Sequence, residues 1–420
     1  MNRSNEMNRI ERPTANHMFF FDMVRNLAML SVVLFHAAGA YSTVTPYWPV
    51  HDGSSIVADG IRELFEVFMM PVFFFLAGYF ALPSLYKQGT RRFLTGKFRR
   101  LGVPWLLALF VIIPMTLHFT RVQANPNLVH QPFWQYWLTY LADFGTFRVG
   151  LLSVDKTNQM HFWFLSLLLT FFTAFGIFHT VRSRIPRTSS GASPIKEPGS
   201  KKSILKVLVL AGVLVSAGYF VVTFMIPDMS WVTVDLLWQF QPGGVVLYIA
   251  CFALGVSAYS RQWFVGDQFP SCLSIWIPIT LLLTAAFFLV GRDVFAHPLD
   301  SNLLPLGLLL AFSVIRTFLC LTFLVVFVAY ARIYWNRPSA FNQKLAANSY
   351  NIYLVHLFFV IPFQNMLMIW PGGPAMAKMA IVFLLVLPIS YGISRLIERF
   401  PRGFVIFLLS LFILAIVATQ

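Results

Sequence analysis

Ten long apolar segments constrain this chain more than any other feature of its sequence. A helix needs about 17–25 predominantly apolar residues to cross the hydrocarbon core of a bilayer. The segments lie at about 18–42, 61–82, 101–119, 161–181, 204–226, 242–260, 272–290, 305–331, 347–369 and 375–396. A shorter run, FVIFLLSLFILAIVA from Phe404, is a candidate eleventh span. The sequence therefore predicts an all-α, polytopic membrane bundle of about ten transmembrane helices.

The composition supports a membrane protein and argues against soluble and nucleic-acid-binding classes. Only 11% of the 420 residues are charged and 58% are hydrophobic, whereas soluble domains are about 25% charged. The net charge of +15 fits basic cytoplasmic loops, so we expect the lipid bilayer and no nucleic acid as a partner. Cys251, Cys272 and Cys320 lack CxxC spacing, so neither a disulfide framework nor a metal site is expected.

Charged residues alternate between the loops and predict the orientation of the chain. Lys and Arg gather at about 87–100, 182–202 and 332–344, whereas the first and fifth loops carry aspartates and no basic residue. Because Lys and Arg are retained on the cytoplasmic side, residues 1–17 are expected to be a cytoplasmic tail. Residues 18–400 would form the transmembrane domain, and residues 401–420 the candidate extra helix.

The first apolar segment contains three ionisable side chains in the stretch DMVRNLAMLSVVLFH. On a helix, Arg25 and His36 lie about 20° apart around the axis and about 16.5 Å apart along it. Asp22 falls on the same face. Ionisable groups within a span are candidates for function. We therefore expect one polar face, with Arg25 near the cytoplasmic interface and His36 deeper, toward the outer side.

This polar face has a structural and a functional interpretation. In the structural one, Arg25 is an interfacial cation paired with Asp22, and His36 bonds a neighbouring helix. In the functional one, which we favour, the chemistry is acyl transfer. A neutral His36 would take the proton of an attacking hydroxyl, and Arg25, oriented by Asp22, would hold the phosphates of a coenzyme A thioester.

Several motifs resemble the membrane acyltransferase 3 family. The pattern of an Arg, ten residues and a His is followed in the family's order by MPVFFFLAGYF, KFRRLGVPW, HFWFLSLLLT and NSYNIYLVHLFF, over nearly the whole chain. The chain departs from the family at two positions. Ala77 stands where Ser is common, and Lys97 replaces the first of two arginines that are usual at this spacing, with Arg100 as the second.

The resemblance implies a function and a location. The donor would be succinyl-CoA or acetyl-CoA, bound from the cytoplasm as a cosubstrate with no resident cofactor. The acceptor would be a hydroxyl of a periplasmic glucan or another envelope glycan, at the outer side of a bacterial inner membrane. Arg25 and His36 would be the essential pair, with His36 the general base, and Lys97 and Arg100 would help to bind the donor. The stretches FFDMVRNL, HFWFL and IYLVH are most similar to members that succinylate periplasmic glucans.

Two further residues in the predicted spans have open roles. Arg316 lies in the middle of a span and should face the bundle interior, because a lipid-facing arginine is costly. It either contacts the donor or takes part in a buried pair. Glu66 most simply marks a solvated helix end, although it could reach the reaction pocket.

The fourth and ninth segments supply candidates for the pocket that holds the acceptor. His161 and Trp163 begin the fourth segment at the outer interface, where they could contact the acceptor or belong to an aromatic belt. Tyr353 and His356, with Tyr350, form a polar stripe at a spacing of three residues. Such a stripe serves either interhelical hydrogen bonds, which we favour, or the pocket.

Two alternatives remain open. An imidazole can itself carry an acyl group, so a covalent intermediate on His36 is the alternative to direct transfer. The rival class is an exporter of a glycan or a lipid-linked sugar, in which His36 would relay protons. No inverted repeat with paired broken helices, which would favour a transporter, stands out in the sequence.

Overall fold

The computed structural model describes residues 18–44, 48–124, 132–143, 149–151, 159–184, 199–228, 230–235, 237–296 and 304–400, together with residues 403, 405, 406, 409, 410 and 413. The predicted tail at 1–17 and most of the candidate eleventh span lie outside these residues.

Nine helical spans within the described residues are long and apolar enough to cross a membrane, and a bent helix pair makes a tenth. The spans are α1 (Phe20–Ala37), α2 (Ile56–Gln88), the third span α3 (Thr90–Lys97), α4 (Val103–Leu107) and α5 (Ile113–Ala124), then α7 (Trp163–Arg184), α8 (Lys201–Met225), α9 (Pro242–Ser260), α10 (Leu273–Ala296), α11 (Leu306–Tyr334), the bent pair α12 (Ala340–Val355) and α13 (Leu357–Leu367), and α14 (Ala375–Arg399). The predicted all-α bundle is confirmed. The ninth predicted segment is not straight, because α12 and α13 meet at an angle of 60°.

A short helix and a small sheet complete the described fold. The helix is α6 (Phe133–Asp143), and the sheet contains β1 (Val149–Leu151), β2 (Val232–Val234) and β3 (Trp238–Phe240) in that order, both pairs antiparallel. Gln239 on β3 accepts a hydrogen bond from the backbone N–H of Gln159, at 2.6 Å. The sheet is thereby tied to the turn that precedes α7.

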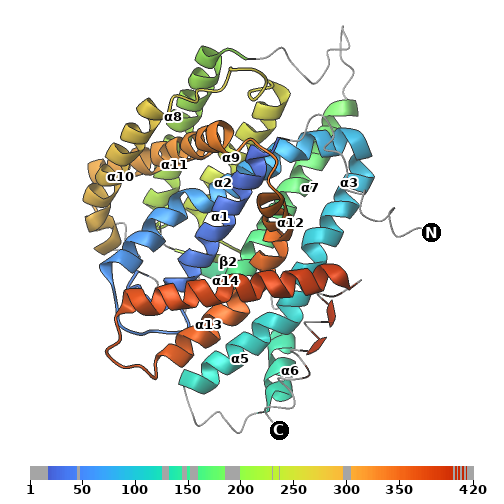
Figure 1. The fold of residues 1–420 in the computed structure, drawn as a ribbon, viewed down its shortest axis with the longest axis vertical. Helices are drawn as coiled ribbons and strands as arrows, with labels where there is room; N and C mark the ends of the chain where they lie inside the picture. The colour runs from blue at the N-terminus through green and yellow to red at the C-terminus, as the bar shows by residue number, and fades with distance from the viewer. Residues whose placement is uncertain are drawn as a thin grey trace, which may run out of the picture.

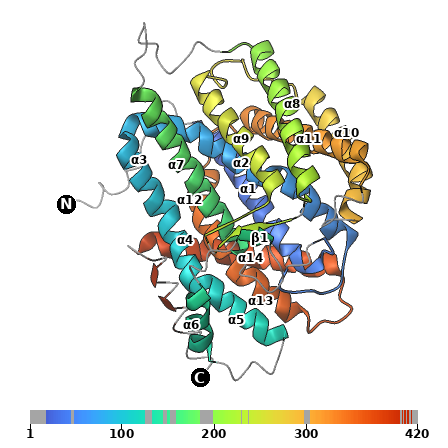
Figure 2. The ribbon, with the colours of Figure 1, turned by 180° about the vertical axis from the view of Figure 1, so that it is seen from behind.

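Helix α1 runs through the middle of the bundle. It packs against α2, α11, α12 and α14. Figures 1 and 2 show α8, α10 and α11 on one side of it and α3 and α7 on the other, with α14 lying across the bundle. Side chains on α1 therefore face neighbours from distant parts of the chain.

Two glycines allow α2 and α9 to pack very closely. A Cβ on Gly78 of α2 would overlap the Phe252 carbonyl of α9, and a Cβ on Gly255 of α9 would overlap the Phe75 carbonyl of α2. Small residues that let backbones approach are a common basis of helix packing in membranes. This contact fixes α2 beside α9.

The third span contains two π-helical turns, at 98–102 and 108–112, each followed by a proline. Pro104 has no N–H, so the carbonyl of Arg100 loses its usual helical donor. The hydroxyl of Tyr350 on α12 donates to that carbonyl. In the same way Pro114 has no N–H to offer the Phe110 carbonyl, and the indole N–H of Trp137 on α6 donates to this carbonyl at 2.7 Å. Aromatic donors from other elements therefore hold both turns.

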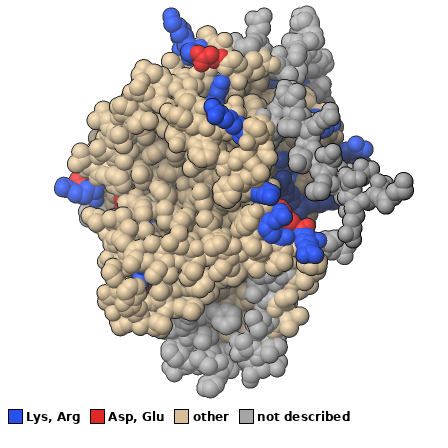
Figure 3. Space-filling model, viewed as in Figure 1, with Lys and Arg blue, Asp and Glu red and all other residues tan. Residues whose placement is uncertain are grey.

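The charge distribution separates the two ends of the bundle. Lys201 pairs with Asp267 at 2.6 Å, and Arg332 donates to the Gly266 carbonyl, near the point where α1 begins. We call this the basic end, because Lys201 and Arg332, from two of the predicted basic regions, lie there. Figure 3 shows that the visible face is otherwise almost uncharged, and leucines on α10 are exposed, as expected for contact with lipid.

Candidate active site

Helix α1 carries Asp22, Arg25 and His36 on one unbroken helix, as the sequence predicted. Arg25 lies in the second turn at the basic end, with its guanidinium 4.0 Å from the Asp22 carboxylate. The Arg25 side chain is 34% exposed and the Asp22 side chain 12%, so the pair is only partly shielded. His36 lies in the last turn, at the opposite end of the bundle.

Arg25 belongs to a group of cations from two spans, which we call the cationic cluster: Arg25, Lys97 and Arg100. Arg25 interacts electrostatically with Arg100, and Lys97 interacts with Arg100. Aromatic rings support two of them, since Lys97 Nζ lies 4.0 Å from the Phe172 ring centroid and Arg100 lies over Tyr350. Figure 3 shows Lys and Arg side chains gathered on the right-hand side of the visible face, with an acidic side chain among them. Such a cluster can bind phosphates.

His36 lies in a cluster of three buried histidines, His36, His161 and His356, from α1, the turn before α7 and the bend between α12 and α13. We call it the histidine cluster. His356 Nε2 lies 3.0 Å from His36 Nδ1. The ring centroid of His161 is 5.1 Å from that of His356 and 6.3 Å from that of His36. The structure thus brings together three residues that the sequence singled out separately.

The hydrogen bonds of the cluster assign its protons. His356 Nδ1 lies 2.8 Å from the Tyr353 carbonyl, so this nitrogen carries the hydrogen and donates it. His356 Nε2 then has a lone pair and accepts from His36 Nδ1, which also lies 2.9 Å from the Val32 carbonyl. His36 Nδ1 is therefore the protonated nitrogen, and the lone pair of a neutral His36 is on Nε2. A base for a substrate hydroxyl needs this arrangement.

The polar stripe on α12 forms the interhelical bonds that the sequence favoured. Tyr350 donates to the Arg100 carbonyl, Tyr353 donates to the His161 carbonyl, and His356 meets His36. One helix therefore connects the third span, α7 and α1. Within the described residues, His161 Nδ1 is buried without a hydrogen-bond partner.

A segment between α1 and α2 covers His36. The ring of Trp48 stacks on His36 with centroids 5.6 Å apart. Trp48 Nε1 donates to Gln364 of α13, whose amide donates to the carbonyls of His36 and Ala37. Asp52 of the same segment pairs with buried Lys378 of α14 at 2.7 Å. The sequence did not single out Trp48, Gln364 or Lys378, because nothing local shows that they meet at His36.

Arg62 is a second feature that sequence reasoning missed. It is only 5% exposed and lies over the rings of Phe35 and Trp48, at 4.0 Å and 5.2 Å from their centroids. Its Nη1 donates to the Phe35 carbonyl at 3.1 Å. The only local signal was a basic residue at the start of an apolar run.

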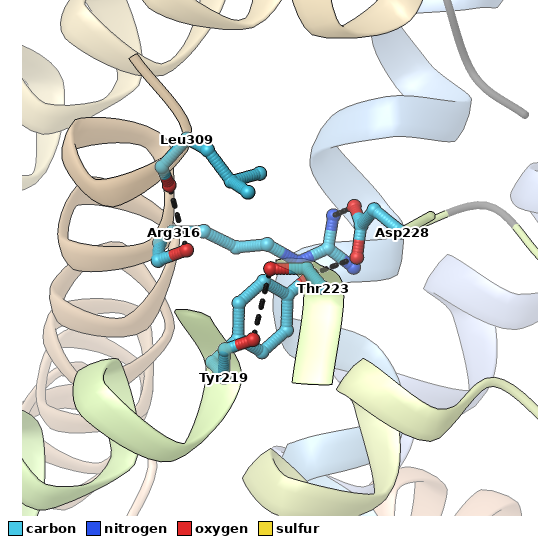
Figure 4. Close-up of polar contacts among 6 residues, drawn as sticks. Tyr219, Thr223, Asp228, Leu309 and Arg316 are labelled. Atoms are coloured by element: carbon cyan, nitrogen blue, oxygen red, sulfur yellow. Dashed lines mark hydrogen bonds and ion pairs between the residues drawn. The ribbon is translucent and has the colours of Figure 1, made fainter. Parts of the chain in front are cut away.

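Arg316 takes part in a buried pair. Its guanidinium lies 3.2 Å from the Asp228 carboxylate, and both side chains are 4% exposed. The hydroxyl of Tyr219 also donates to Asp228. Figure 4 shows Arg316 extended from α11 toward Asp228. The pair lies at the end where α8 finishes, opposite the basic end, so the structure provides the buried partner that was one of the two predicted roles.

Glu66 and Trp163 also lie outside the histidine cluster. Glu66 forms a side-chain hydrogen bond with Gln241 and interacts electrostatically with Arg316. Trp163 contacts Trp231 and Tyr248, with centroids 5.4 Å and 5.9 Å away. None of these contacts involves His36.

The histidines do not converge on a common centre. His36 Nδ1 and His356 Nε2 point at each other, whereas metal ligands point at the ion. Within the part of the chain that is described, no group of three His, Cys, Asp or Glu side chains could hold a metal ion. The arrangement is suited to proton transfer.

Comparisons with known proteins agree with this chemistry. A family model described as an acyltransferase domain matches residues 18–395. Curated relatives named glucans biosynthesis protein C are similar. The protein from Salmonella heidelberg (strain SL476) is 25% identical over 246 residues, 57% of this chain and 58% of the relative. The protein from Escherichia coli (strain K12) is 24% identical over 258 residues, 58% and 59% of the two chains. Each match spans less than two thirds of the relative's length. No solved structure is significantly similar.

Proposed function

This chain belongs to the acyltransferase 3 family of membrane proteins, and we propose that it moves an acyl group from acyl-CoA to a hydroxyl of a glucan or another envelope glycan. The donor binds at the basic end, which faces the cytoplasm of a bacterium. The acceptor reaches His36 from the opposite side of the inner membrane. Succinyl and acetyl groups are the proposed acyl groups, and the relatives' name supports a glucan acceptor.

The proposed reaction is a direct transfer with His36 as general base. His36 Nε2 takes the proton of the acceptor hydroxyl while its oxygen attacks the thioester carbonyl carbon. The tetrahedral intermediate carries a negative charge on the former carbonyl oxygen. Its collapse breaks the carbon–sulfur bond, and the departing thiolate takes the proton from the His36 imidazolium. The products are an ester and free coenzyme A.

The cationic cluster provides the donor site in this proposal. Arg25 and Arg100 bind the phosphates, Lys97 adds a third positive charge, and Asp22 orients Arg25. Arg25 and His36 are separated by about 16.5 Å along α1. The phosphates are therefore held at one end of the donor while its thioester lies beside the base.

The assignment of the His36 proton carries the proposal, because it leaves Nε2 as the basic nitrogen. The test uses purified protein in liposomes, with labelled succinyl-CoA or acetyl-CoA and a glucan acceptor. The unchanged protein should label the glucan. His36→Ala should lose the activity while remaining folded, and Arg25→Ala should raise the KM for the donor.

His179→Ala is the matched control, because His179 contacts Tyr86 rather than the histidine cluster and should be dispensable. Normal labelling of the glucan by His36→Ala would overturn the proposal. Glycan movement across the liposome without acylation would instead support the exporter.

A further inference from the structure

Arg62 is a buried cation whose hydrogen-bonding capacity is not fully used. Within the described residues, no carboxylate lies within salt-bridge distance of its guanidinium. Its Nε is buried without a hydrogen-bond partner. Glu66 and Asp59 act on it only through space, and Asp59 already accepts bonds from Ser42 and Thr43. A buried charge without direct pairing costs several kcal/mol, so the position of Arg62 calls for a further explanation.

Arg62 lies beside the proposed base. Arg62 and His36 both pack against the ring of Trp48, and Arg62 bonds the carbonyl of Phe35, the residue before His36. The charge of Arg62 acts electrostatically on His36. Because this charge would oppose an imidazolium on His36, its position is better explained by an anion that forms next to the base.

Acyl transfer produces such an anion. As His36 takes the proton from the acceptor, negative charge develops on the oxygen of the thioester carbonyl. We propose that Arg62 is the catalytic residue that stabilises this oxyanion, through its unused N–H and its buried charge. This inference rests on the proposed function, and it assigns Arg62 a different task from Arg25, which holds the other end of the donor.

Burial makes Arg62 suited to this task. The rings of Phe35 and Trp48 both pack against the guanidinium, so little reorganisation is needed when the charge forms. A preorganised donor in a site of low dielectric typically contributes about 10²–10³-fold to kcat. The competing explanation is that Arg62 only holds Trp48 and Phe35 in place. In that case an aliphatic side chain of similar length would preserve turnover.

The experiment measures kcat, the KM for acyl-CoA and thermal unfolding for Arg62→Met and Arg62→Lys in the liposome assay. We expect Met to lower kcat by about 10²-fold with little change in the KM for the donor. Lys keeps the charge but loses the planar fork, so its loss should be smaller. Free ethylguanidinium should restore part of the turnover of Arg62→Ala, whereas tetramethylammonium should not.

Arg332→Met is the matched control. Arg332 also lies against aromatic rings, those of Phe20, Phe264 and Phe269, but at the basic end, away from His36. Its loss should lower stability and leave kcat unchanged. An Arg62→Met variant with kcat within about threefold of normal would overturn the inference.

If Arg62→Met does not fold, a wild-type kcat for Arg62→Lys together with no rescue of Arg62→Ala would overturn the inference as well. Activity in His36→Ala would overturn the proposed function itself. An inactive His36→Ala together with a fully active Arg62→Met would remove only the role of Arg62.

Discussion

His356 Nε2 accepts a hydrogen bond from His36 Nδ1 at 3.0 Å, across a separation of 320 residues in the chain. The contact is directional because the Tyr353 carbonyl fixes the proton of His356 on Nδ1. In the proposed reaction His356 is a positioning residue, since it would act on the substrate only through His36. It holds the ring of His36 and keeps the lone pair on Nε2.

This relationship predicts opposite results for two substitutions of His356. The amide oxygen of His356→Gln can still accept from His36 Nδ1, so this variant should keep most of its turnover. His356→Leu offers no acceptor, and kcat should fall by about 10–100-fold, the range typical of partners that orient a functional histidine. The KM for acyl-CoA should be unchanged in both variants, because the cationic cluster is intact.

If kcat fell equally in the two variants, in proportion to the loss of folded protein, His356 would serve only the packing of the helices. Steady-state kinetics with quantification of folded protein by size-exclusion chromatography separates the two cases.

The bond between Tyr350 and the Arg100 carbonyl predicts a coupling with Pro104. Tyr350→Phe removes the donor to this carbonyl, and the loss of a typical hydrogen bond should cost about 0.5–1.5 kcal/mol. Pro104→Ala restores a backbone N–H next to the same carbonyl. In the double variant the loss of stability should therefore be smaller than the sum of the two single losses.

Thermal unfolding of the four proteins of this cycle measures the coupling. Trp137→Phe with Pro114→Ala provides the same test in the second π-helical turn. Additive losses in both cycles would show that the aromatic donors do not compensate for the prolines.

The sequence was sufficient to predict the membrane spans and the polar face of α1, because both depend on the local spacing of residues. An apolar run of about 20 residues predicts a membrane helix, and helical periodicity places Arg25 and His36 on one side. The ordered motifs then predicted the family. These patterns do not depend on how the helices pack against one another.

The rest of the site depends on packing between distant segments. His36 meets His356 only because α12 ends in a bend at that residue, and neither Gly nor Pro occupies the position to signal it. Helix α2 begins at Ile56 rather than near residue 61 as predicted. Glu66 therefore lies well inside the helix and contacts Gln241, where the sequence had suggested a solvated helix end.

The pair of Arg316 and Asp228 predicts a stability effect without a donor effect. Removing one partner of a buried ion pair leaves the other charge unpaired, which typically lowers the free energy of unfolding by about 3–5 kcal/mol. Arg316→Met should therefore unfold at a lower temperature. Combining it with Asp228→Asn, which removes the orphaned charge, should recover part of the loss. The KM for acyl-CoA should be normal in the double variant, because the pair lies opposite the basic end.

A raised KM for the donor in folded double variant would instead favour the other predicted role of Arg316, direct contact with acyl-CoA. Equilibrium binding of acyl-CoA to the same protein checks this without relying on turnover.

The crossing of α2 and α9 predicts that alanine is not tolerated at Gly78 or Gly255. A methyl group at either position would overlap a backbone carbonyl of the facing helix, and backbone cannot turn aside as a flexible side chain can. The helices must then move apart, which should cost at least about 1–3 kcal/mol and lower the yield of folded protein. Gly60→Ala is the matched control on the same helix, because its Cβ would lie 3.7 Å from the Phe288 ring, an ordinary contact. Fluorescence-detected size exclusion after heating compares the three variants. Wild-type stability in Gly255→Ala would show that the close approach of the two backbones is not required for the fold.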